Sequence, residues 1–153
     1  EMCIRDRGTS FTLIDDSFNA NPDSMKAGLN GLKAWNSNDG KEPFRVALLG
    51  AMLELGADET ALHTSIGTYA DELGIDAIIA VGSAQDQHLD ALAQALADGA
   101  RQSQSASVDC VHDIDAAEQL VIDLARNHPD AVVLLKGSHA SGLSALAERW
   151  AKN

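Results

Sequence analysis

Basic residues, cysteines and long apolar runs are all scarce in this sequence of 153 residues. Lys and Arg number 11 against 23 Asp and Glu, so the formal net charge is −12. A field of that sign repels phosphate backbones and anionic lipid headgroups, so we expect no nucleic acid partner and no membrane insertion. No apolar run approaches the roughly 20 residues that a membrane-spanning helix needs. An anionic small ligand is still possible, because local N–H groups and one lysine can outweigh a diffuse field at contact distance.

Cysteine is limited to Cys3 and Cys110. The sequence has no Cys/His cluster for zinc, and we expect a buried, inert thiol at Cys110, a stray thiol at Cys3, no metal held by this chain, and a cytoplasmic protein. The opening residues, EMCIRDR, are charged and lack the apolar centre of a secretory signal. We interpret residues 1–7 as the edge of a fragment or an expression remnant that stands outside the fold.

What the sequence does contain is a regular alternation of two patterns. Apolar runs without polar alternation are typical of strands covered on both faces, and they occur at Phe11–Ile14, Phe44–Gly50, Asp76–Gly82, Ser107–Val111 and Ala131–Gly137. Helical patterns cover Pro22–Trp35, Asp58–Leu73, Asp86–Ala97, Asp113–Arg126 and Ser141–Ala151, and polar loops cover 36–43 and 99–106. The length suits one domain. The alternation predicts an α/β fold, a Rossmann-like, open, mostly parallel sheet of five or six strands with helices on both faces.

Ligands of such sheets lie outside the carboxyl ends of the strands. The first run ends there in DDSFNANPDS. Asn21 and Pro22 are a good N-cap and a good first helical residue, so a helix start explains them without a ligand. Adjacent carboxylates repel each other and add nothing to a core. We therefore predict that Asp15 or Asp16 binds a ligand, because carboxylates at strand ends accept hydrogen bonds from ribose hydroxyls or help to hold a metal.

Lys136 ends the last apolar run, and the loop GSHASG follows it. A lysine after five apolar residues is costly to bury unless an anion pairs with it. Ser138 and Ser141 lead into a helix N-terminus, which binds carboxylate or phosphate through free N–H groups and the helix dipole. The pattern predicts an anion site. The alternative is a salt bridge from Lys136 to Asp15 or Asp16, with Ser141 as an ordinary helix cap.

The loop after the second run, GAMLELGADE, places Glu54 between glycines in apolar surroundings. A lone carboxylate there indicates a ligand or an ion-pair partner. Asp58 is expected to cap the next helix, and His63 to be a partly exposed residue of that helix rather than a catalytic base. The apolar stripe of this helix is assigned to Leu62, Ile66, Tyr69, Ala70 and Leu73.

Neither the phosphate-binding loop GxxxxGK[ST] nor a GxGxxG after the first run is present. If this domain handles ATP, it holds part of the nucleotide while another module holds the triphosphate.

Three stretches occur in a fixed order: LIDDSFNANPDSM, VALLGAMLELGADE and LLKGSHASGLSAL. In order and spacing they resemble the C-terminal domain of the Mur ligase family, over about residues 8–153. The resemblance is strongest to the MurF type, which joins D-alanyl-D-alanine to UDP-N-acetylmuramoyl-tripeptide in peptidoglycan synthesis. Two positions depart from the family pattern: Phe18 stands for the usual tyrosine, and Ala51 for the aspartate of GDM.

The resemblance implies a ligase in which an N-terminal domain and a central ATPase domain precede this one. ATP and Mg²⁺, held mainly by the central domain, would activate the tripeptide carboxylate as an acyl phosphate, which the amine of D-alanyl-D-alanine attacks. The residues implied to contact the nucleotide are Asp15, Asp16, Asn19 and Asn21. Those implied to lie near the dipeptide are Lys136, Ser138, Ser141 and Glu54. No catalytic set is complete in this chain, so by itself it is expected to ligate nothing.

Three alternatives share parts of this pattern. A phosphoacceptor receiver domain needs an aspartate after the third run, where AIIAVGS has none. A Mur-type domain that adds another amino acid would differ after the second and fifth runs. A non-catalytic Rossmann-like interaction module would keep the fold alone, so Asp16, Lys136 and Ser141 could each become Ala without changing the affinity for any ligand.

Overall fold

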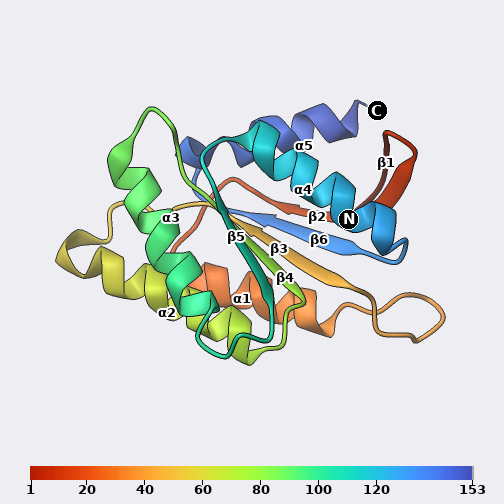
Figure 1. Ribbon diagram of the computed structural model, residues 1–153, viewed down its shortest axis with the longest axis horizontal. Helices are drawn as coiled ribbons and strands as arrows, with labels where there is room; N and C mark the ends of the chain where they lie inside the picture. Colours follow the sequence, from red (N-terminus) through yellow and green to blue (C-terminus); the bar gives the residue numbers. More distant parts are fainter. Residues whose placement is uncertain (153) are drawn as a thin grey trace.

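The computed structural model describes residues 1–152, and these form a six-stranded sheet in the order β1-β2-β6-β3-β4-β5 (Figure 1). The parallel strands are β2 (Thr9–Asp16), β3 (Arg45–Leu49), β4 (Ala77–Val81), β5 (Ser107–Val111) and β6 (Val132–Lys136). The remaining strand, β1 (Met2–Asp6), pairs with β2 in the antiparallel direction. The predicted α/β fold is therefore confirmed, with six strands.

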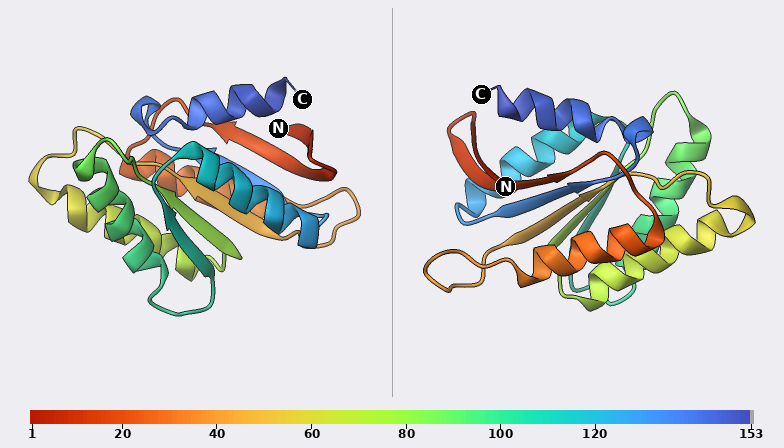
Figure 2. Two further views of the ribbon diagram at one scale, coloured as in Figure 1. Left: turned by 45° about the horizontal axis from the view of Figure 1, so that its top comes forward. Right: turned by 180° about the vertical axis from the view of Figure 1, so that it is seen from behind.

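The helices divide between the two faces of the sheet (Figure 2). One face carries α1 (Pro22–Ala34), α2 (Glu59–Glu72) and α3 (Gln87–Ala100), and the other carries α4 (Ile114–Asn127) and α5 (Leu143–Ala151). Short 3₁₀ helices at Gly56–Asp58 and His139–Ser141 precede α2 and α5. Right-handed crossovers explain the division, because the chain advances from β2 to β5 and then returns to place β6 between β2 and β3.

Each face of the sheet buries its own apolar layer. Leu13, Leu135 and Trp150 belong to the layer under α4 and α5, whereas Leu29 and Leu134 belong to the layer under α1, α2 and α3. Every residue of β3, β4 and β6 is buried. Strands covered on both sides cannot alternate with polar residues, which is why these segments are continuous apolar runs in the sequence. No helix within residues 1–152 is long and apolar enough to span a bilayer.

The expectation that residues 1–7 stand outside the fold is wrong. Met2–Asp6 form β1, where Ile4 pairs with Phe11 and joins the apolar layer that contains Trp150. The segment looked unstructured because an edge strand buries only part of its length, here Ile4 among exposed and charged neighbours. Phe11 and Trp150 meet edge to face at 5.1 Å, so the ends of the described chain share one core.

The boundary of α3 also differs from the expected one. The helix continues to Ala100 instead of ending at Ala97, since Gly99 and Ala100 are buried where α3 crosses α2. Glycine at this crossing is a packing requirement: a Cβ on Gly67 of α2 would overlap the Leu96 carbonyl oxygen, and a Cβ on Gly99 would overlap the Thr64 carbonyl oxygen. From the sequence alone, Gly99 indicates a loop. The structure shows that it allows α3 to pack closely against α2.

The two cysteines are free, as expected. Cys3 is exposed, whereas Cys110 is half-buried rather than fully buried. Burial raises the pKa of the Cys110 thiol, which keeps it protonated and poorly reactive.

Gly67→Ala is expected to lower the free energy of unfolding by about 1–3 kcal/mol, because the added methyl group forces α2 and α3 apart. Gly31→Ala on α1 is the matched control, since a Cβ there meets no atom of the described chain within 4 Å. The control should stabilise the chain by up to about 1 kcal/mol through helix propensity. Urea denaturation followed by circular dichroism measures both, and equal effects of the two variants would contradict the close-packing argument.

Candidate functional site

The predicted site residues gather at the carboxyl edge of the sheet, where the loops after β2, β3 and β6 leave it (Figure 1). Strands β2 and β6 are neighbours, and their register places Asp16 directly beside Lys136. Leu49, the last residue of β3, pairs with Lys136 from the other side. The acidic pair and the lysine–serine turn, Lys136–Ser141, therefore lie at the same edge of the sheet. We call this edge the rim, and define it by Asp16, Asn19, Lys136, Ser138 and the loop at 50–55.

Lys136 is the centre of the rim. Its side chain is only 2% exposed and points to the α1 face, where a Cβ on Gly28 would lie 2.7 Å from its Cδ. The Nζ donates to Asp16 Oδ2 at 2.7 Å and to the Asn19 carbonyl oxygen at 3.1 Å. The salt bridge that we left open as an alternative is thus present. An ammonium group has three N–H donors, and these two bonds use two of them.

Asp16 differs from Lys136 in exposure, because 49% of its side chain faces solvent. It can therefore neutralise the lysine and still present a carboxylate oxygen outward. Asp15 turns to the loop instead, where its Oδ1 accepts from the Ser17 backbone N–H at 3.2 Å and from the Ser17 hydroxyl at 2.5 Å. Lys136 stabilises the carboxylate of Asp16, and Ser17 stabilises that of Asp15. These separate partners offset the repulsion between the two adjacent carboxylates.

Asn21 starts α1 as expected. Its Oδ1 accepts from the Ser24 N–H at 2.9 Å, and its own N–H donates to the Ser24 Oγ at 3.0 Å, which completes a capping box with Pro22 at the first helical position. Such caps stabilise a helix by about 0.5–2 kcal/mol. The capping bond uses the Asn21 oxygen, so a nucleotide contact from this residue is left to its exposed amide nitrogen. Asn19 is exposed and lends only its carbonyl to Lys136.

The loop after β6 is packed against the loop after β3 through glycine. A Cβ on Gly137 would lie 2.8 Å from Gly50 Cα, and a Cβ on Gly50 would lie 2.7 Å from the Ser141 Oγ. Backbone bonds join the same loops: Gly50 N–H donates to the Lys136 carbonyl at 2.9 Å, and Ser138 N–H donates to the Ala51 carbonyl at 3.0 Å. The two loops therefore form one body.

The two serines of this loop have different surroundings. Ser141 is not an ordinary helix cap, because Gly142 occupies the N-cap position of α5. The Ser141 hydroxyl donates to the Ser138 carbonyl at 2.6 Å and accepts, at 3.4 Å, from Leu143 N–H. Ser138 is 8% exposed, and within residues 1–152 its Oγ meets no hydrogen-bond partner. A buried hydroxyl in that state is costly, by about 1–3 kcal/mol, unless a ligand or water satisfies it.

The loop after β3 carries Glu54 on the surface, in a left-handed conformation with φ of 61°. That conformation costs a non-glycine residue of the order of 1–3 kcal/mol and is concentrated at functional sites. Leu53 is 39% exposed in the same loop, and Phe18 is 76% exposed in the loop after β2. Two exposed apolar side chains thus lie in the loops that form the rim. Asp58, expected as a cap, is at the N-cap position of α2 but makes no side-chain cap bond.

His63 overturns an expectation. We expected partial exposure, but the residue is fully buried, with Nε2 accepting from the Met52 N–H at 2.9 Å and Nδ1 at 2.7 Å from the Glu59 carbonyl oxygen. Of the apolar stripe predicted for α2, Ile66 and Ala70 are buried as expected, whereas Leu62, Tyr69 and Leu73 are only half-buried. The other buried residues of the helix are His63, Gly67 and Asp71. The signal was available, since His63 precedes Ile66 by three residues and Ala70 by seven, the spacing of one helix face.

No group of three Asp, Glu, His or Cys residues within 1–152 is arranged to hold a metal ion. Two exposed histidines pair singly with acids: His88 Nε2 lies 2.8 Å from Glu59 Oε1, and His112 Nδ1 lies 2.7 Å from Asp90 Oδ2.

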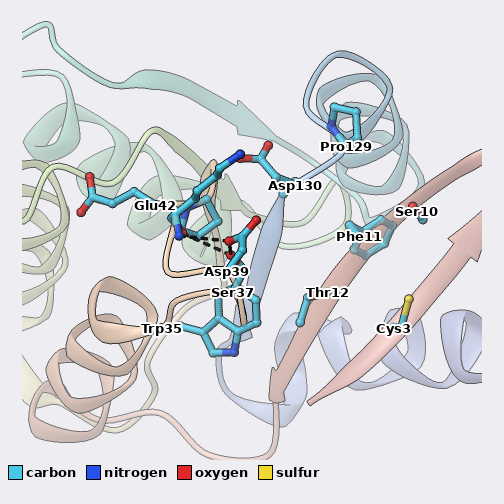
Figure 3. Close-up of a pocket in the computed structure, with 13 residues that line it drawn as sticks. Cys3, Ser10, Phe11, Thr12, Trp35, Ser37, Asp39, Glu42, Pro129 and Asp130 are labelled. Atoms are coloured by element: carbon cyan, nitrogen blue, oxygen red, sulfur yellow. Dashed lines mark hydrogen bonds between the residues drawn. The ribbon is translucent and has the colours of Figure 1, made fainter.

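A cleft of about 280 Å³ lies at the amino ends of β2 and β6, whereas the rim lies at their carboxyl ends. Trp35, Phe11 and Pro129 line the cleft together with Asp39 and Asp130 (Figure 3). These residues come from the amino ends of β2 and β6 and from the loop after α1. At the rim, by contrast, Asp16, Asn19 and Glu54 face solvent.

Asp16→Asn is expected to destabilise the chain by about 3 kcal/mol, because it leaves a buried ammonium without its anion. Lys136→Met should cost less than about 1 kcal/mol, since it removes the buried charge, keeps the packing against Gly28, and leaves Asp16 in contact with water. Asp130→Asn, in the exposed turn before β6, is the control. Chemical denaturation measures the free energy of unfolding of each variant. A larger loss of stability in Lys136→Met than in Asp16→Asn would contradict the prediction.

Comparison with known proteins agrees with this geometry. A family model described as "Mur ligase, glutamate ligase domain" matches residues 2–139. A UDP-N-acetylmuramoyl-tripeptide--D-alanyl-D-alanine ligase of Mycobacterium tuberculosis (strain CDC 1551 / Oshkosh) is 38% identical over 153 residues, covering 96% of this chain and 30% of that protein. The chain thus spans less than a third of this relative's length.

Solved structures show the same fold. MurF from Acinetobacter baumannii superposes with a TM-score of 0.73 at 25% identity, over 99% of this chain and 30% of that one. MurF ligase from Thermotoga maritima, solved in complex with ADP, gives 0.63 at 21% identity, over 98% of this chain and 30% of that one. With the family model covering nearly the whole sequence, the conclusion is direct: the chain belongs to the Mur ligase family, in the part that this family's C-terminal domain occupies.

Proposed function

We propose that this chain is the C-terminal domain of an ATP-dependent ligase that joins D-alanyl-D-alanine to UDP-N-acetylmuramoyl-tripeptide. The proposal includes a cytoplasmic location and a role in peptidoglycan synthesis, and hence in cell-wall biogenesis, cell shape and cell division. It is supported by the relatives, which carry the name of that ligase. The observation that carries it is the rim itself, where Asp16, Lys136 and the buried Ser138 hydroxyl meet at the carboxyl ends of β2 and β6.

The acidic side of the rim is proposed to hold the nucleotide. Asp16 offers a half-exposed carboxylate oxygen to a ribose hydroxyl, and a charge-assisted hydrogen bond of that kind is worth about 1.5–3 kcal/mol. The amides of Asn19 and Asn21 are exposed beside it, and Asp15 shapes the loop through Ser17. These residues fit the sugar of ATP. The chain offers no metal cluster within 1–152, so the proposal assigns Mg²⁺ mainly to the central domain.

The lysine side of the rim is proposed to face the reacting carboxyl group and the incoming dipeptide. The third N–H of Lys136 and the Ser138 hydroxyl can donate to a carboxylate or phosphoryl oxygen, and the N-terminus of α5 adds a partial positive charge. Glu54, exposed in the neighbouring loop, can accept from the amino group of the dipeptide. Ser141 supports this side by orienting the Ser138 backbone.

Closure onto the two other domains completes the proposed site. An acyl phosphate must be shielded from water while the amine attacks, and an open rim provides no shield by itself. Phe18 and Leu53 are exposed on the loops around the rim, and apolar side chains in such positions are stabilised when a second surface covers them. The partners of the domain are therefore the N-terminal and central domains of its own protein.

A specific observation favours the interaction module as a second candidate. Lys136 is already neutralised by Asp16, so a purely structural role accounts for both charges. The interaction module leaves the buried Ser138 hydroxyl without a role, whereas the proposed ligase domain gives this hydroxyl a ligand oxygen to bind.

Phosphate release from ATP tests the ligase function. The chain is joined behind the N-terminal and central domains of a MurF relative and supplied with UDP-N-acetylmuramoyl-tripeptide. We expect release that depends on D-alanyl-D-alanine, with much lower rates for free D-alanine and L-alanine, and no release from the chain alone. Equal rates with all of these amines would exclude the dipeptide assignment.

Lys136→Met in the same joined protein is expected to lower kcat by roughly 10²–10³-fold, the usual loss when a preorganised charge at the reacting centre is removed. Lys26→Met on α1 is the matched control, because Lys26 lies over the Tyr69 ring, on the outer surface of the helix layer. Steady-state phosphate release measures both variants. Full activity of Lys136→Met would remove the catalytic role proposed for this side chain and leave it only its structural ion pair with Asp16.

A further inference from the structure

His63 is a buried polar residue that the proposed function does not use. It lies on the first turns of α2, fully enclosed, and both ring nitrogens are engaged. Met52 N–H donates to Nε2, so Nε2 must be unprotonated, and Nδ1 must carry the hydrogen that bonds the Glu59 carbonyl. The arrangement therefore requires the neutral imidazole in one tautomer.

The bond to Met52 is the last of three that hold consecutive residues of the loop after β3. Gly50 N–H is bound to the Lys136 carbonyl, the Ala51 carbonyl receives Ser138 N–H, and Met52 N–H is bound to His63. Two of these bonds tie the loop to the lysine–serine turn, and the third ties it to α2. Residue 51 is alanine here instead of the aspartate of the family pattern. Its contact with the rim is therefore made by its backbone carbonyl, which accepts from Ser138 N–H.

We propose that His63 is a positioning residue for the rim. By accepting the hydrogen bond from Met52 N–H, it holds the loop at 50–52 in the conformation in which the Ala51 carbonyl accepts from Ser138 N–H. His63 touches no substrate in this proposal. It acts through the loop, and its loss releases Ser138 and Glu54 from their fixed places. This inference rests on the proposed function in one respect: the proposed function is what makes the Ser138 hydroxyl a ligand-binding group.

Protonation of the His63 ring would break its hydrogen bond with Met52 N–H. An imidazolium has hydrogens on both nitrogens, so the Nε2–H would oppose the Met52 N–H. Burial lowers the pKa of His63, the carbonyl and charge of Glu59 raise it, and the charge of His88 on α3 lowers it. Because the pKa of His63 in the folded chain lies below the ordinary value of 6.5, the stabilisation from this contact is fully present above pH 6.5. It weakens as the pH falls from 6.5, and it is lost once the pH passes the lowered pKa of the folded chain.

Amide hydrogen exchange of the ¹⁵N-labelled 153-residue chain between pH 8 and pH 5 tests the proposal. Corrected for intrinsic exchange, the protection of the Met52 and Ser138 amides should fall together below pH 6.5, by up to about tenfold per pH unit for a one-proton linkage. In His63→Gln, whose Oε1 can accept from Met52 N–H without titrating, protection should be retained and independent of pH. In His63→Ala it should be low throughout.

His128→Gln is the control for general histidine titration, because His128 stacks on Phe44 at the opposite edge of the sheet and should leave the profile unchanged. Should His63→Gln fail to fold, the wild-type chain still decides, because the protection of the Met52 and Ser138 amides must stop falling at the pH where the His63 ring ¹⁵N shifts titrate. Protection that keeps falling below that pH, or the same pH profile in His63→Gln as in the wild type, would overturn the proposal. No substrate enters this measurement, so its outcome is separate from that of the ligase assay.

Discussion

A buried ammonium group must have an anion close by, and this requirement organises the whole edge of the sheet. Lys136 lies at the end of a central strand with almost no exposed surface, so its charge is satisfied by Asp16 from the neighbouring strand and by a carbonyl of the following loop. Gly28 leaves room for the aliphatic part of the lysine against α1. One ion pair therefore joins β2, β6, the β2–α1 loop and α1, across 120 residues of sequence.

Close backbone packing extends that order to the next loop. Gly50 and Gly137 approach so nearly that neither position has room for a Cβ, and the bonds from Gly50 to Lys136 and from Ser138 to Ala51 follow from that approach. His63 then fixes the far side of the loop to α2. Hydrogen bonds and close packing therefore hold the backbone at Lys136, at Ser138 and in the loop at 50–52, and polar groups that are already in place need less reorganisation when a charged ligand arrives. The apolar residues Phe18 and Leu53, by contrast, are exposed to solvent.

The charge and the polar groups of the rim are typical of a surface that completes a ligand site together with another domain, rather than of a complete site. The net charge of −12 disfavours a free-standing receptor for a triphosphate, and no phosphate-binding loop is present in the sequence. A surface that offers one carboxylate, one screened lysine and one buried hydroxyl can orient parts of a ligand held elsewhere. Such a division of labour is consistent with a chain that spans about 30% of its relatives' length.

The sequence by itself determined the alternation of strands and helices, the cap of α1 at Asn21 and Pro22, and the gathering of polar residues at the carboxyl edge. Each of these depends on neighbours along the chain or on the shared direction of parallel strands. Only the tertiary structure decided that β6 lies beside β2, that Asp16 rather than Asp15 pairs with Lys136, that Met2–Asp6 form a strand, and that His63 is buried. Those outcomes depend on contacts between residues far apart in sequence. Local patterns carry no information about which of two adjacent carboxylates a distant segment will meet. The spacing of His63 with Ile66 and Ala70 allows its burial, but only the fold brings the Met52 N–H to its ring.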